Sequence, residues 1–206
     1  MEPAAQRLDV NTILRLAAEE FAANGYDGMS MRTLAERCSV TAAAIYYHFS
    51  SKEALYDEVC TWIFEKVVST VVTETNAARS PEEKIEKFVL TLFDEWNKDR
   101  IALILTMRDA VNASVRRDQS YAFPQYLRSV VAIKDVLSQM TGAEVDEATA
   151  FTFMSMLFGF CCLMAYPATE SGMSNTDYVK ARREKLLEFS KLFLIGLAPK
   201  GETIRN

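Results

Sequence analysis

Apolar residues recur at the spacing of an α-helix from about residue 10 to the end of this chain of 206 residues. Alternation of apolar and polar residues, which would indicate β-strands, is nearly absent. The seven glycines and five prolines fall mostly between the periodic segments. Half of the residues are hydrophobic, which at this length is enough to build a substantial core. The sequence therefore predicts an all-α protein of about nine helices.

Local signals predict where these helices begin and end. The first helix is expected to end before Gly25, a residue that readily adopts the conformation found after a helix C-terminus. Ser30 and Thr41 are expected to cap two short helices, because their side-chain oxygens can accept hydrogen bonds from unpaired backbone N–H groups. Ser50 and Glu53 form an S-x-x-E capping box for a long fourth helix that ends near residue 76. The other helices are expected at residues 10–24, 81–96, 99–114, 124–141, 146–166 and 176–197.

Residues that support catalysis or metal binding are scarce. His48 is the only histidine, and Cys38, Cys60, Cys161 and Cys162 show no paired metal-ligand spacing. The sequence contains no nucleophile, metal or phosphate-loop motif. The N-terminal residues contain no apolar signal core. We therefore expect a protein that is not an enzyme, binds no metal or cofactor and remains in the reducing cytoplasm.

One apolar run, residues 148–168, has no charged side chain and is long enough for a transmembrane helix. Its flanks are acidic rather than rich in lysine and arginine, and several small polar residues interrupt it. A helix that is apolar on all sides is otherwise one that packs on several sides, for example in its own core and against a second copy. We therefore expect a packed helix whose partner is the final helix, and no membrane partner.

The net charge of −5 is unusual for a protein that binds nucleic acid, and residues 1–60 are the more acidic part. These residues hold five basic and nine acidic side chains, a balance of −4, whereas residues 61–206 hold 18 and 19, a balance of −1. Residues 30–52 are the exception, because they contain three basic residues and one acidic residue. Any positive surface is therefore expected to be local.

Residues 30–53 read as two short helices joined by a tight turn. An apolar set at helical spacing can bury one side of the pair, namely Leu34, Ala35, Val40, Ile45 and Phe49. The other side presents side chains that can bind phosphate, namely Arg32, Thr41, Tyr47, His48 and Lys52. In a helix-turn-helix, the second helix lies in the major groove of DNA and its N-terminal residues approach base edges. The pattern therefore predicts a DNA-binding helix-turn-helix.

The same residues resemble the N-terminal domain of the tetracycline-repressor (TetR) family of bacterial transcriptional regulators. The resemblance covers about residues 13–59 and includes FAANGY at 21–26, SMRTLA at 30–35 and IYYHF at 45–49, followed by SKEAL at 51–55. It implies that DNA is contacted by Arg32, Thr41, Tyr46, Tyr47, His48 and Lys52, with Ala42 and Ala43 closest to the bases. Two residues depart from the family pattern. Ser39 replaces the usual turn glycine, so either a left-handed conformation there costs on the order of 1 kcal/mol or the turn differs slightly, and Ala43 stands where glycine is common.

The resemblance also implies the function of the rest of the chain. It divides the protein into a DNA-binding domain at residues 1–51 and an effector-binding and dimerisation domain at residues 52–206. The expected protein is a homodimer formed through the last two long helices, and a small hydrophobic effector releases it as a repressor from a palindromic operator. Large or polar residues on the middle helices are candidates for the effector pocket, namely Trp62, Trp96, Met107, Arg108, Asn112, Phe151, Met154 and Phe158.

Two alternative functions remain open from the sequence. The first is a helical ligand-binding or scaffold protein that has the same fold without a DNA function. The second is a regulator that senses redox state through Cys38 or the adjacent Cys161 and Cys162.

Overall fold

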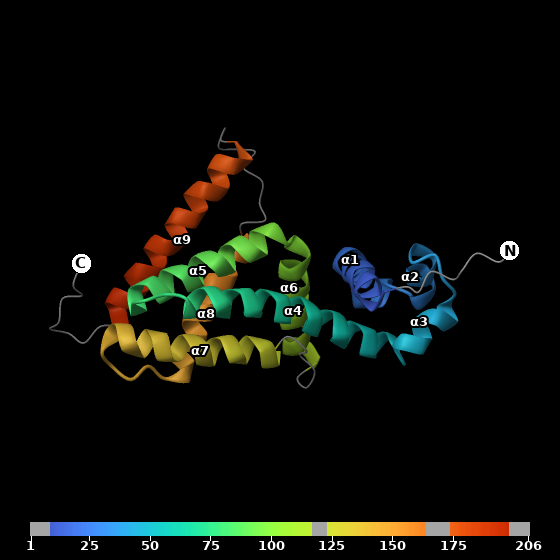
Figure 1. The fold of residues 1–206 in the computed structure, drawn as a ribbon, viewed down its shortest axis with the longest axis horizontal. Helices are drawn as coiled ribbons and strands as arrows, with labels where there is room; N and C mark the ends of the chain where they lie inside the picture. Colours follow the sequence, from blue (N-terminus) through green and yellow to red (C-terminus); the bar gives the residue numbers. More distant parts are fainter. Residues whose placement is uncertain (1–8, 117–122, 164–173, 198–206) are drawn as a thin grey trace. The chain divides into compact units, whose positions relative to one another are not determined.

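The computed structural model describes residues 9–116, 123–163 and 174–197. These residues form nine α-helices and no strand, which confirms the all-α prediction for the described part of the chain (Figure 1). None of these helices is long and apolar enough to cross a membrane. The helices are α1 (Val10–Gly28), α2 (Met31–Arg37), α3 (Ala42–His48), α4 (Lys52–Asn76), α5 (Pro81–Lys98), α6 (Arg100–Arg116), α7 (Phe123–Thr141), α8 (Glu147–Leu163) and α9 (Asn175–Leu197).

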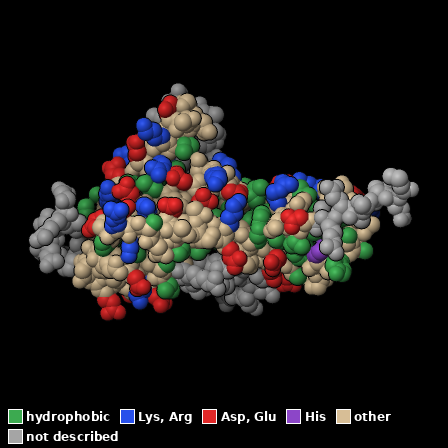
Figure 2. Space-filling model, viewed as in Figure 1, with side chains coloured by type: hydrophobic (Ala, Val, Ile, Leu, Met, Phe, Trp, Pro, Cys, Tyr) green, Lys and Arg blue, Asp and Glu red, His purple; other side chains and the backbone are tan. Residues whose placement is uncertain are grey.

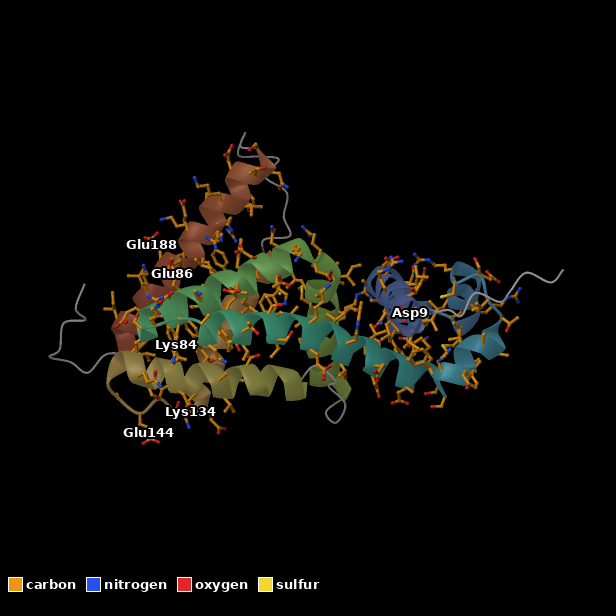
Figure 3. All side chains as sticks on the ribbon, viewed as in Figure 1. Asp9, Lys84, Glu86, Lys134, Glu144 and Glu188 are labelled. Carbon is orange, nitrogen blue, oxygen red and sulfur yellow. The ribbon has the colours of Figure 1, made fainter. Side chains whose placement is uncertain are left out.

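Short-range hydrogen bonds begin several of these helices. Asp9 lies at the start of α1 (Figure 3), where its carboxylate accepts a hydrogen bond of 3.3 Å from the backbone N–H of Asn11. The Ser80 hydroxyl accepts a hydrogen bond of 3.1 Å from the Glu83 backbone N–H at the start of α5. At the end of α7, Gly142 has a φ of 67°, the left-handed conformation that glycine adopts without strain.

The cap of α4 differs from the sequence prediction by one residue. The hydroxyl that accepts a hydrogen bond from the backbone of the first turn belongs to Ser51, which bonds the N–H of Ala54 at 3.0 Å. A capping side chain reaches the third N–H of the helix that follows it. Because α4 begins at Lys52, Ser51 occupies the capping position and Ser50 lies one residue too early.

The chain divides into two compact units. The first contains Met1–Glu65 and Ile104–Phe123, and the second contains Lys66–Leu103 and Pro124–Asn206. In the first unit, α2 packs against both α1 and α3. In the second, α5, α8 and α9 pack against one another. The boundary predicted between residues 51 and 52 separates a DNA-binding domain from an effector-binding domain by function. It stays a prediction.

In the second unit, α9 has one buried side and one exposed apolar side. Leu186 and Leu194 are almost fully buried, whereas Phe189, Leu192 and Ile195 are 51%, 55% and 58% exposed. Figure 2 shows that basic and acidic side chains are interspersed over the surface of α5 and α9. Arg183 of α9 donates hydrogen bonds of 2.9, 3.2 and 3.0 Å to the carboxylate of Asp94 on α5.

Candidate nucleic-acid interface

The helix-turn-helix is built by two capped helices and a left-handed turn residue. The Ser30 hydroxyl accepts a hydrogen bond of 3.0 Å from the Thr33 N–H at the start of α2, and the Thr41 hydroxyl accepts one of 3.3 Å from the Ala44 N–H at the start of α3. Between the helices, Ser39 has a φ of 57°, so the turn keeps the left-handed conformation despite the missing glycine. A side chain at such a φ is strained, which explains why glycine is the usual residue there.

The apolar side of the helix pair is buried as predicted, with one exception. Leu34 and Ile45 are fully buried, and Ala35 and Phe49 are 3% and 6% exposed. Val40 is only half-buried, because it lies in the turn rather than on either helix. This packing fixes which side of α3 faces outward.

The outward side of α3 carries most of the residues that the sequence assigns to DNA. Tyr46 is 51% exposed and Tyr47 is 85% exposed, and His48 is also exposed. Figure 2 shows the histidine at the surface with hydrophobic side chains beside it. Thr41 and Ala43 are exposed, whereas Ala42 is half-buried. The structure therefore brings these residues together on one surface of the first unit.

Arg32 extends from α2 and is also exposed. Its Nε donates a hydrogen bond of 3.1 Å to the Glu36 carboxylate one turn further along the helix. Both side chains are largely exposed, at 87% and 66%. Such surface pairs contribute little free energy, so a phosphate group can compete for the guanidinium.

Lys52 is held by an aromatic group that the sequence reasoning missed. Its ammonium nitrogen lies 4.6 Å from the centre of the Tyr26 ring, a geometry typical of a cation–π interaction. Tyr26 in turn lies edge-on to Tyr56, with ring centres 5.3 Å apart, and stacks with Phe21 at 6.0 Å. No spacing in the sequence links residues 26 and 52, since the contact forms only when α1 packs beside the start of α4.

Ion pairs fasten α2 to α1. Arg37 donates hydrogen bonds of 2.6 and 2.8 Å to the carboxylates of Glu19 and Glu20. These hydrogen bonds, that to Glu19 first, raise the pKa of Arg37 above its ordinary value. Glu20 also accepts a hydrogen bond of 2.8 Å from the amide of Asn24. The Arg37 side chain therefore links α2 to α1 and is not available to bind a phosphate group.

Arg108, a candidate for the effector pocket, lies against the end of α1. A Cβ atom placed on Gly25 would lie 2.5 Å from Nη1 of Arg108. The glycine has a φ of 73° and a ψ of 175°, which interrupts α1 and leaves room for the guanidinium. Through this contact, α6 touches the helix that packs on the helix-turn-helix.

The other pocket candidates are distributed over both units. In the second unit, the rings of Trp96 and Phe158 meet edge-on with centres 5.4 Å apart. Met154 lies one turn before Phe158 and is 2% exposed, whereas Phe151 is 42% exposed on another side of α8. In the first unit, Trp62 is half-buried and Met107 is 38% exposed. The side chain of Asn112 lies outside the described residues.

The part of the chain that the structure describes contains no group of histidine, cysteine, aspartate and glutamate that could hold a metal ion. The four cysteines are free, and three of them are buried. Burial raises the pKa of Cys161 to about 12 and that of Cys162 to about 11.

Solved structures share the fold over nearly the whole chain. A TetR-like transcriptional regulator from Rhodococcus sp. RHA1 matches with a TM-score of 0.72 at 16% identity, covering 95% of this chain and 100% of that one. The ketosteroid transcriptional regulator KstR2 of Mycobacterium tuberculosis matches with a TM-score of 0.67, also at 16% identity, covering 96% and 98%. Identities this low show the fold alone.

Sequence comparison matches the N-terminal segment to a known family. The model of the bacterial regulatory proteins of the tetR family matches residues 13–59, the segment that holds the helix-turn-helix. The HTH-type transcriptional repressor KstR2 of Mycolicibacterium smegmatis is 30% identical over 117 residues, which cover 55% of this chain and 54% of the relative. Matches to the first three curated relatives span 34% to 54% of their length. The helix-turn-helix, the all-α fold and these similarities agree, and residues 13–59 form an N-terminal domain of the TetR family.

Proposed function

We propose that the chain is a dimeric, DNA-binding transcriptional regulator, a cytoplasmic repressor that a small hydrophobic effector releases from a palindromic operator. The observation that carries the proposal is the outward side of α3. Burial of Ile45 and Phe49 leaves Tyr46, Tyr47 and His48 exposed together on a helix that a capped turn holds in position. A second helix presented in this way fits the major groove.

Contacts with DNA phosphates would supply most of the binding free energy, and they would do so for any base sequence. The Tyr47 hydroxyl and the His48 imidazole can donate to phosphate oxygens from the end of α3. Lys52 can do so from the first turn of α4, where the helix dipole also favours an anion. The acidic balance of residues 1–60 limits this attraction to the local surface, so moderate affinity per subunit is expected.

Dimerisation is supported by the exposed apolar side of the last helices. Phe189, Leu192 and Ile195 on α9 and Phe151 on α8 are each more than 40% exposed. Large apolar side chains gathered on packed helices are typical of a surface that meets another protein. A two-fold dimer through this surface would present two helix-turn-helix motifs to a palindromic site.

Release by a hydrophobic effector is supported by the interior of the second unit. Its aromatic and methionine side chains, such as Trp96, Met154 and Phe158, suit an apolar ligand. The effector would favour a conformation in which the two motifs are wrongly spaced for DNA. The contact of Arg108 with Gly25 gives α6 a means of acting on α1. Repression rather than activation is favoured by the relative that is named a repressor.

Capture of genomic DNA fragments on the purified chain tests the proposal, followed by gel-shift titration of the enriched sequence. We expect enrichment of a palindromic sequence and loss of binding when Tyr47 is replaced by alanine. Lys66→Ala is the matched control, because Lys66 is an exposed lysine of α4 outside the helix-turn-helix. Apolar ligands are then added to the complex. Absence of any enriched sequence would favour a scaffold protein of the same fold, and a tightly bound ligand that leaves operator affinity unchanged would exclude release by that ligand.

The redox alternative loses support from the surroundings of the cysteines. The thiolate is the reactive form of cysteine, and a raised pKa makes it scarce at neutral pH. Burial raises the pKa of Cys38 as well as those of Cys161 and Cys162. Peroxide is therefore expected to leave operator binding unchanged. Reversible loss of binding on peroxide treatment would support a regulator that senses redox state.

A further inference from the structure

The first turn of α3 presents methyl groups to the outside. Ala42, Ala43 and Ala44 carry no polar side-chain atoms, and Ala43 is the exposed member of the three. Thr41, which precedes them, is fixed in its capping position by the hydrogen bond that its hydroxyl accepts from the Ala44 N–H. The end of α3 that meets base edges in a helix-turn-helix is therefore mainly apolar.

The polar atoms of α3 lie at its other end. Tyr46, Tyr47 and His48 occupy the last three positions of the helix, and Lys52 follows at the start of α4. Side chains at this end suit the DNA backbone, which fixes the position of a protein on the duplex without reading the sequence. Side chains that would position the protein on the DNA thus lie at one end of α3, and side chains that would read the base sequence lie at the other.

An alanine methyl can recognise only one feature of a base edge in the major groove. Hydrogen-bonding side chains distinguish the acceptor O4 of thymine from the donor N4 of cytosine, but the 5-methyl group of thymine is recognised by apolar contact. Ala43 can sense this methyl group and cannot sense the atom at position 4. A pyrimidine that carries a 5-methyl group should therefore satisfy it, whichever pyrimidine that is.

We propose that Ala43 reads a 5-methylpyrimidine in each operator half-site, and that 5-methylcytosine can replace thymine at that position. This inference rests on the proposed DNA-binding function. It also gives the protein a sensitivity to DNA methylation, because an operator with cytosine at this position is bound more tightly when the cytosine is methylated.

The first experiment replaces thymine by deoxyuridine, one position at a time, in the sequence enriched from genomic DNA. Deoxyuridine differs from thymidine in the base only by the lost methyl group. At the position read by Ala43, affinity should fall about fourfold per half-site, which corresponds to about 0.8 kcal/mol for one buried methyl-sized group. Deoxyuridine in the flanking DNA is the control and should have no effect.

A double-mutant cycle that combines Ala43→Gly in the protein with deoxyuridine in the operator tests whether Ala43 makes the contact with the thymine methyl group. The variant should lose about fourfold in affinity per half-site on the thymine operator, and show little further loss when deoxyuridine is introduced. The deoxyuridine operator also corrects for any effect of glycine on the stability of α3, because such an effect weakens binding to both operators alike. Equal sensitivity of parent and variant to deoxyuridine would overturn the role of Ala43.

The last experiment compares cytosine with 5-methylcytosine at the sensitive position, each paired with guanine. The methylated operator should be bound about fourfold more tightly per half-site than the unmethylated one. Equal binding of the two, or equal binding of thymine and deoxyuridine at every position, would overturn the proposal while leaving the DNA-binding function intact. Failure to enrich any sequence would overturn both.

Discussion

Gly25 is the residue at which a single added methyl group should most disturb the first unit. Its φ of 73° and ψ of 175° fall in a region that essentially only glycine occupies. An alanine Cβ at this position would also lie 2.5 Å from Nη1 and 3.8 Å from Cζ of Arg108. Gly25→Ala therefore combines backbone strain with a steric collision, and the two effects can be separated.

Backbone strain should account for most of the loss. A residue forced into such a conformation costs about 1–3 kcal/mol, and alanine returns about 0.4–1 kcal/mol by restricting the unfolded chain. The collision is with the far end of a flexible side chain, which can rotate away. We expect the free energy of unfolding to fall by about 1.5 kcal/mol, which lowers Tm by about 3–6 °C in a chain of this size.

Urea denaturation at one fixed protein concentration measures this change, because the proposed dimerisation would make stability depend on concentration. Gly142→Ala is a control without a collision, since that glycine also has a positive φ, of 67°, and no atom within 4 Å of an added Cβ. Arg108→Ala removes the collision. If the stability of Gly25→Ala lies within about 0.5 kcal/mol of the parent, or Arg108→Ala restores it fully, strain is not the dominant effect.

Three further predictions follow from single contacts. Lys52→Ala should weaken binding to all DNA sequences alike and reduce the slope of log K against log salt by about 0.9 per subunit; an unchanged slope would place Lys52 away from the phosphates. Cys161 and Cys162, whose pKa values burial raises to about 12 and about 11, should react with iodoacetamide at pH 7 far more slowly than an unfolded-chain thiol, and equal rates would contradict their burial. Hydrogen bonds from Thr149 lower the pKa of Asp146 in the folded state below its ordinary value of 3.8. The ionised carboxylate therefore stabilises the folded state at pH values above 3.8. This stabilisation disappears as the pH falls through the lower pKa of the folded state. Asp146→Ala should accordingly destabilise the chain at neutral pH and much less in acid, and a loss independent of pH would refute this assignment.

The sequence by itself determined the helices and most of their ends. Ser30 and Thr41 could be identified as caps because a capping side chain bonds a backbone group only two or three residues away. The same short range explains the error at Ser51, where two adjacent serines carry the same signal and only the position of the first turn separates them. The buried side of the helix-turn-helix was also predictable, since helical periodicity fixes which residues share a side.

Only the tertiary structure decided the contacts between segments that are distant in the sequence. Lys52 lies over the ring of Tyr26, Arg37 is committed to two carboxylates of α1, and Arg108 lies against Gly25. No periodic pattern encodes these contacts, because each depends on how two helices pack and on which rotamer the packing permits. Sequence therefore supplied the residues that can meet DNA, and packing determined which charged side chains remain available for it.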